Sequence, residues 1–120
     1  MPVLTRLLGV ATAAYGAAIV AEPKFLARPC GLADAHGNVA PAVRTMVGGI
    51  GARDLAIGAA MVFAPAGTPT RVAVAARVAS DLADALVFGL TLPDRAARPK
   101  VAAFAVTWAV ACAVSAFGKK

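Results

Sequence analysis

Residues 41–63 read PAVRTMVGGIGARDLAIGAAMVF. The charged residues of this stretch are Arg44, Arg53 and Asp54, and nearly all the others are apolar or small. At about 1.5 Å of rise per residue, a helix of this length is about 35 Å long, which exceeds the ~30 Å hydrocarbon core of a bilayer. The stretch therefore predicts a helix that crosses a membrane while carrying charge at its centre.

Three other apolar runs of similar length flank this one, at residues 3–21, 70–92 and 99–117. Proline and glycine mark the connections, as in the tight turn APAGTP at residues 64–69. Because short connections make neighbouring helices antiparallel, we expect an all-α fold. The predicted architecture is an integral membrane four-helix bundle with up-down-up-down topology and short loops.

The composition is that of a protein whose solvent is lipid. Hydrophobic residues make up 60% of the chain and charged residues 15%, against about 45–50% and ~25% in soluble domains, and the mean hydropathy is +0.76. A small soluble domain needs more polar residues to cover its surface. We therefore expect residues 1–120 to form a single transmembrane domain in the cell membrane, as a multi-pass protein.

Two alternatives to this architecture were weighed. A soluble, alanine-rich helical protein is disfavoured because no run shows the wide polar face that such helices need. A cleaved signal peptide would fit Arg6 followed by an apolar stretch, but Ile19, Val20 and Ala21 lack the small-x-small pattern of a cleavage site. The sequence favours a retained membrane helix over both.

The net charge of +6 and the pI near 10.2 raise the question of a nucleic-acid partner. The basic residues are not clustered on one stripe, and aromatic residues for base stacking are few. Lysine and arginine at the ends of membrane helices extend to phospholipid head groups. We expect the lipid bilayer, and not nucleic acid, as the partner of these charges.

Five ionisable residues lie in the interior of the second and third predicted spans, away from their first residues. Arg53 and Asp54 are central in residues 41–63, and spacings of four and three place Arg77, Asp81 and Asp84 on one stripe of residues 70–92. Unpaired in hydrocarbon, five such groups would cost on the order of 15 kcal/mol. They must therefore face each other, a polar cavity or another subunit.

Two arginines against three aspartates leave one carboxylate in excess. Protonation of one aspartate would neutralise a dry cluster, and a neutral carboxyl beside a charged one is an acid next to a base. The candidate catalytic residues are therefore Asp54, Asp81 and Asp84.

The candidate substrate-binding residues are Arg53, Arg44 and Arg77. For Arg44 and Arg77, which lie closer to helix ends, extension to the membrane surface is the alternative.

Glycines and two aromatic residues indicate how the predicted helices pack against one another. Gly48, Gly51 and Gly58 lie on one helical stripe, which is typical of close helix packing. Tyr15 and Trp108 lie deep in their runs, where core or cavity lining is expected rather than an interfacial belt. No phosphate loop, redox motif, metal-ligand spacing or nucleophile elbow is present, so no cofactor and no metal are expected.

The string Gly51-Ala-Arg53-Asp54-Leu-Ala-Ile-Gly58, followed by Asp81 or Asp84, resembles a family of small, largely actinobacterial membrane proteins. These proteins carry a domain of unknown function and are similar in layout to DoxX-like proteins. The resemblance covers the whole chain in length and hydropathy, and the Arg53-Asp54 segment is its specific part. It implies a four-helix membrane fold and no reaction.

Three functions fit these observations. The leading hypothesis is a polar pocket, lined by the arginine–aspartate cluster, for a lipophilic small molecule, with cofactor-independent acid–base chemistry of the isomerase or cyclase type. The second is a proton-coupled transporter or channel-like homo-oligomer, in which the cluster relays protons. The third is a structural or partner-binding membrane subunit without turnover, in which the ion pairs hold the helices together.

Overall fold

The computed structural model of the chain describes residues 2–118, and this range contains five helices and no strand. The predicted all-α class is confirmed. The helices are α1 (Pro2–Ala21), α2 (Lys24–Ala27), α3 (Pro41–Phe63), α4 (Thr68–Thr91) and α5 (Ala97–Phe117).

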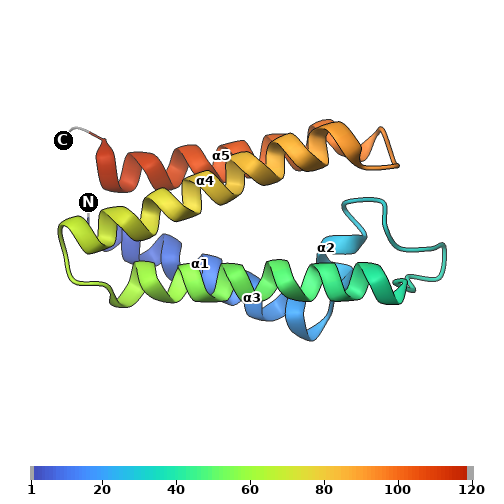
Figure 1. Cartoon of the computed structure of the whole chain (residues 1–120), viewed down its shortest axis with the longest axis horizontal. Helices are drawn as coiled ribbons and strands as arrows, with labels where there is room; N and C mark the ends of the chain where they lie inside the picture. The colour runs from blue at the N-terminus through green and yellow to red at the C-terminus, as the bar shows by residue number, and fades with distance from the viewer. Residues whose placement is uncertain (1, 119–120) are drawn as a thin grey trace.

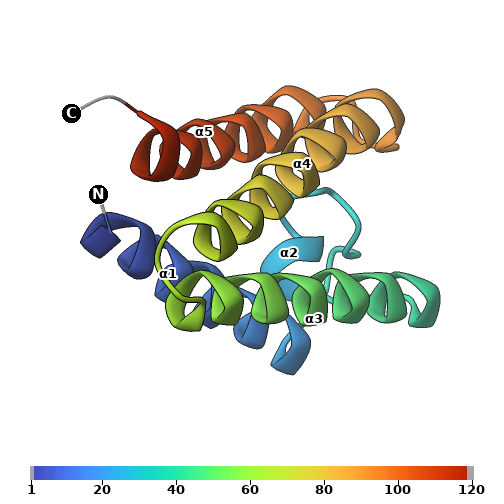
Figure 2. The ribbon, with the colours of Figure 1, turned by 60° about the vertical axis from the view of Figure 1, so that its left-hand side comes forward.

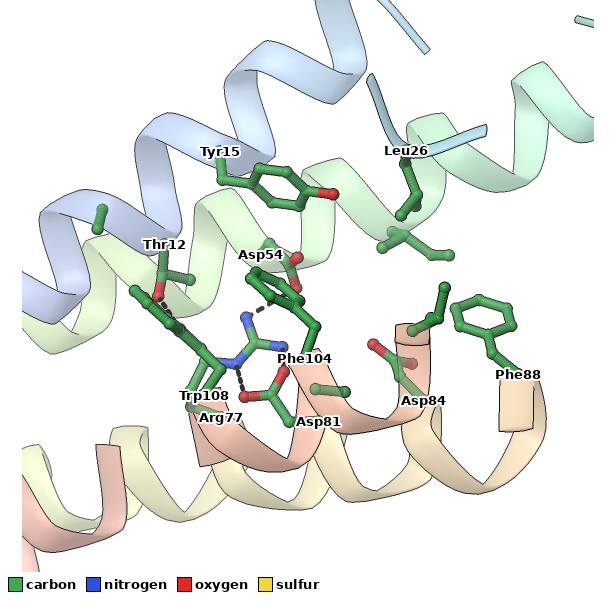
Figure 3. A pocket seen from close by; sticks show the side chains of 14 residues that line it. Thr12, Tyr15, Leu26, Asp54, Arg77, Asp81, Asp84, Phe88, Phe104 and Trp108 are labelled. Carbon is green, nitrogen blue, oxygen red and sulfur yellow. Dashed lines mark hydrogen bonds and ion pairs between the residues drawn. The ribbon is translucent and has the colours of Figure 1, made fainter. Parts of the chain in front are cut away.

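The short helix α2 was not expected from the sequence. It is a single turn after Pro23, and its apolar residues are too few to show a helical period. Beyond it the chain reverses through Gly31 and Gly37, whose φ angles of 73° and 81° favour glycine. The segment then leads to α3, and α2 itself places Leu26 in the lining of a pocket between the helices (Figure 3).

The four long helices run alternately in opposite directions along the longest axis, as the colour order in Figure 1 shows. They form two layers: α1 lies against α3, and α4 lies against α5 (Figures 1 and 2). The contact between α3 and α4 is smaller than the contact within either layer. The molecule is elongated, with extents of 45 × 25 × 16 Å.

Glycines bring α1 and α3 into backbone contact. A Cβ atom at Gly51 would lie 2.6 Å from the carbonyl oxygen of Gly16, and one at Gly58 would lie 2.7 Å from that of Gly9. The predicted close packing is therefore confirmed for Gly51 and Gly58. It is wrong for Gly48, where nothing lies within 4 Å of the built Cβ. The glycines of α1 that complete this contact were missed.

The buried residues of α3 follow spacings of four and three, the repeat of helices packed side by side. Asp54 is one of them and falls between the two packed glycines, on the same stripe: Val47, Gly51, Asp54, Gly58 and Met61. On α4 the buried stripe includes Ala73, Val74, Arg77 and Asp81. The tight α1–α3 contact thus fixes a rotation of α3 that buries Asp54, whose carboxylate reaches Arg77 on α4.

The outer surface is apolar while charged groups are inside. Val3, Phe63, Leu90 and Val114, on four different helices, are 58% to 81% exposed. Three helices, α1, α3 and α5, are long and apolar enough to cross a membrane by length and composition. Helix α4 is equally long but carries four charged residues, which lower its hydropathy: Arg71, Arg77, Asp81 and Asp84.

Candidate functional site

Five charged side chains form one ion-pair network between the two layers. Negative and positive side chains alternate along the chain of ion pairs, which runs from Asp81 through Arg77, Asp54 and Arg53 to Asp84. All five are the ionisable residues expected to face one another. Because α3 and α4 otherwise touch little, the network is a main link between the layers.

Arg77 is at the inner end of the network, with a side chain that is 2% exposed. Its Nε and Nη2 atoms donate to the two oxygens of Asp81, one turn further along α4, in a bidentate pair. Its Nη1 donates to Asp54 Oδ1 on α3 at 2.8 Å. Arg77 therefore does not extend to the surface, which was the alternative for this residue.

Arg53 makes the second bridge between the layers. Its Nη1 and Nη2 atoms donate to Asp84 Oδ1 and Oδ2 at 3.1 and 2.6 Å, again in a bidentate pair. Its Nε and Nη2 also donate to Asp54 Oδ1, at 3.2 and 3.0 Å. The side chain of Arg53 is 32% exposed, so this outer end of the network is less enclosed than the Arg77 end.

Asp54 lies at the centre of the network, and its two carboxylate oxygens differ in their hydrogen bonds. Its Oδ1 accepts hydrogen bonds from both arginines, whereas its Oδ2 accepts none from any residue that the structure describes. No fully buried side-chain polar atom within residues 2–118 lacks a hydrogen-bond partner, so Oδ2 is open to the adjacent space. Asp81 and Asp84, by contrast, each use both oxygens on an arginine.

A cavity of about 250 Å³ lies over this network, between the two layers. Four charged residues of the network form one wall, and Figure 3 shows the carboxylates of Asp54, Asp81 and Asp84 around it. The remaining lining is apolar or aromatic except for Thr12 and comes from α1, α2, α4 and α5 as well as α3: Ala11, Thr12, Tyr15, Leu26, Ile50, Phe88, Val101, Phe104, Ala105 and Trp108.

Three aromatic side chains line the cavity together with the charged residues. Phe104 stacks with Trp108, with ring centroids 6.3 Å apart, and is tilted against Tyr15 at 6.5 Å. The Trp108 Nε1–H donates to Thr12 Oγ1 at 3.0 Å, which holds the indole in place (Figure 3). Tyr15 and Trp108 line the cavity, as the sequence predicted.

The cavity continues into a wider hollow towards the α2 end of the molecule. Four residues line both spaces: Tyr15, Leu26, Val101 and Phe104. The outer hollow has a volume of about 580 Å³ and carries charged residues at its edge, namely Arg28, Asp94 and Lys100. The two spaces are therefore adjacent, with these shared side chains between them.

A cluster of packed apolar residues that includes Leu8, Met61, Val74 and Cys112 lies further along the helices, away from α2. Along α1, Leu8 falls between Thr12 of the cavity and Thr5 of a separate hollow near the α3–α4 turn. Thr5 itself is hydrogen-bonded to Ser115 of α5 at 2.8 Å.

The structure separates the predicted site residues into two groups. The cavity is lined by Asp54, Arg77, Asp81 and Asp84. Arg53 does not line the cavity, but it is paired with Asp54 and Asp84. Arg44 is exposed on α3 and is absent from both the network and the cavity lining that the structure describes. Thr12 and Phe104 belong to the lining and were missed, because no charge or motif in their helices marks them.

No group of three or more histidine, cysteine, aspartate or glutamate side chains within residues 2–118 is placed to hold a metal ion. Comparison of the chain with protein families, characterised proteins and solved structures found no match. The geometry of the site is therefore the basis for assigning a function.

Proposed function

We propose that the chain is an integral membrane protein whose four long helices form an up-down-up-down bundle, with α4 crossing beside the three more apolar helices. The inverted distribution of side chains supports this proposal. Large apolar residues cover the outside, while Asp54, Arg77 and Asp81 are at most 6% exposed. Soluble monomers rarely expose apolar patches larger than a few hundred Å², whereas lipid requires such a surface.

Alkaline carbonate extraction of membranes from an expression host tests this architecture. An integral protein stays in the membrane pellet, and a peripheral protein is released. Release of the chain into the supernatant, together with a monodisperse soluble form, would contradict the proposal.

The function that the site supports best is the binding of a small lipophilic molecule in the central cavity. The observation that carries this proposal is the cavity itself, with about 250 Å³ of space lined by aromatic side chains and the ion-pair network. Ligand sites combine mostly apolar linings with a few convergent polar groups. An engineered apolar cavity of about 150 Å³ already binds benzene, so this space admits a somewhat larger molecule.

Trp108 reports directly on the cavity because it lines it and is the one tryptophan of the chain. In lipid nanodiscs, the neutral probe neopentylbenzene is expected to change the Trp108 fluorescence with saturation. Ala105→Leu fills the cavity and should abolish the saturable change. The matched control is Ala103→Leu, because Ala103 is exposed on the same helix and outside the lining. Equal responses in all three proteins would contradict a binding cavity.

A second candidate function, proton abstraction from the bound molecule, is favoured by the open Oδ2 of Asp54. A carboxylate oxygen without a donor can accept a proton from a ligand carbon, and return of that proton to another carbon gives an isomer. Incubation of the protein with a lipid extract of the host membrane in D₂O tests this step. Turnover predicts deuterium in one lipophilic component with the unmodified protein and none with Asp54→Asn.

A further inference from the structure

We propose that the ligand of the central cavity is a lipophilic cation, such as a substituted ammonium with an apolar or aromatic group. This proposal rests on the binding function proposed above and adds the chemical class of the ligand. It follows from the charge of the network, the open oxygen of Asp54 and the chemistry of the lining.

The network is short of one positive charge. Two guanidinium groups face three carboxylates, so the fully ionised network carries one net negative charge. A charge that is buried without a partner is unfavourable, and a cation in the cavity would compensate it. The open oxygen lies where such a cation would bind, because Asp54 lines the cavity and its Oδ2 accepts no hydrogen bond from the described residues.

The lining offers little to an anion. Arg77 donates its hydrogen bonds to Asp54 and Asp81. The indole N–H of Trp108 donates to Thr12. The other cationic member of the network, Arg53, does not line the cavity. An anionic ligand would therefore meet three carboxylates with few donors to offset them, whereas a cation would leave all the ion pairs intact.

Aromatic rings distinguish a cation from a neutral molecule. Tyr15, Phe104 and Trp108 face the space next to the carboxylates (Figure 3), and ring faces attract ammonium groups within about 6 Å. The outer hollow carries Arg28 and Lys100 beside Asp94, so it does not favour a cation. The preference therefore arises in the inner cavity, where carboxylate and rings act together.

Two probes of nearly equal shape isolate the effect of charge. Benzyltrimethylammonium and neopentylbenzene differ by one nitrogen in place of one carbon, and both are titrated against Trp108 fluorescence in nanodiscs. Each affinity is corrected for the measured partition of the probe into the lipid. We expect the cation to bind the unmodified protein at least about tenfold more tightly than the neutral probe, because a desolvated cation–ring contact alone has this magnitude.

The outcomes separate this inference from the binding function. Equal affinities overturn the cation preference and leave the binding function standing, whereas no saturable response to either probe overturns both. Asp54→Asn should reduce the ratio of the two affinities to within about threefold. Phe104→Leu, at a largely exposed position, is a second variant for the case that Asp54→Asn does not fold, and it should weaken the cation more than the neutral probe.

Discussion

Arg77 Nη1 on α4 lies 2.8 Å from Asp54 Oδ1 on α3, and this ion pair joins the two layers of the molecule at its centre. Both side chains are at least nine-tenths buried. Arg77 also holds Asp81, and Asp54 also contacts Arg53, so one contact connects the two halves of the network. Its loss would divide the network into two halves, with Asp54 paired to Arg53 alone and Arg77 paired to Asp81 alone.

Arg77→Met is therefore expected to destabilise the protein strongly. Methionine keeps a long side chain in place but removes the charge, which leaves the buried Asp81 without its arginine and Asp54 with Arg53 alone. Removal of one partner from a buried pair costs about 3–5 kcal/mol. The free energy of unfolding in SDS titrations measures the effect. Arg44→Met is the matched control, because Arg44 is exposed and outside the network, and a change within about 0.5 kcal/mol is expected.

The bridge between Arg53 and Asp84 predicts partial rescue by charge reversal. Arg53→Asp and Asp84→Arg each place like charges opposite one another across the α3–α4 contact. The double variant restores opposite charges at this position. In a double-mutant cycle we expect a coupling free energy between about 0.5 and 3 kcal/mol. Strict additivity of the two single effects would show that the bridge does not contribute to stability.

The glycine contacts predict opposite effects for two identical substitutions on α3. Gly51→Ala places a Cβ 2.6 Å from the carbonyl oxygen of Gly16, and it should destabilise the protein by about 1–3 kcal/mol through overpacking. Gly48→Ala meets nothing within 4 Å, so it should stabilise the helix by about 0.5–1 kcal/mol. Thermal unfolding in detergent compares the two. A loss of stability in Gly48→Ala would contradict the open space that the structure shows around Gly48.

Cys30, in the connection between α2 and α3, predicts a pH-dependent reactivity. Burial, with a smaller effect of the Asp84 charge, raises the pKa of the Cys30 thiol from 9.0 to about 11. Because the thiolate is the nucleophile, this lowers its fraction about 100-fold near neutral pH. Ellman's reagent should modify Cys30 in a Cys112→Ser variant at least that much more slowly than in the SDS-unfolded chain. The rate should rise about tenfold per pH unit between pH 8 and 10. Equal rates in the two states would contradict the buried thiol.

Local sequence periodicity was enough to predict several features. Apolar runs of about 20 residues and the prolines and glycines between them predicted the all-α class. The spacings of four and three predicted that Arg77, Asp81 and Asp84 share one face of their helix, and the three residues lie together in the structure. Periodicity works here because the side-chain direction in a helix depends only on position along that helix.

The relationships between helices were decided by the tertiary structure alone. Backbone contact through Gly9 and Gly16 fixes how α3 is rotated against α1, and this rotation brings Asp54, but not Arg44, into the network. The pairing of each arginine, the open Oδ2 of Asp54 and the aromatic lining from α1 and α5 all follow from that packing. The sequence by itself determined which charges lie inside the helices, whereas packing determined which carboxylate oxygen meets the cavity, because register between helices depends on contacts that no single helix contains.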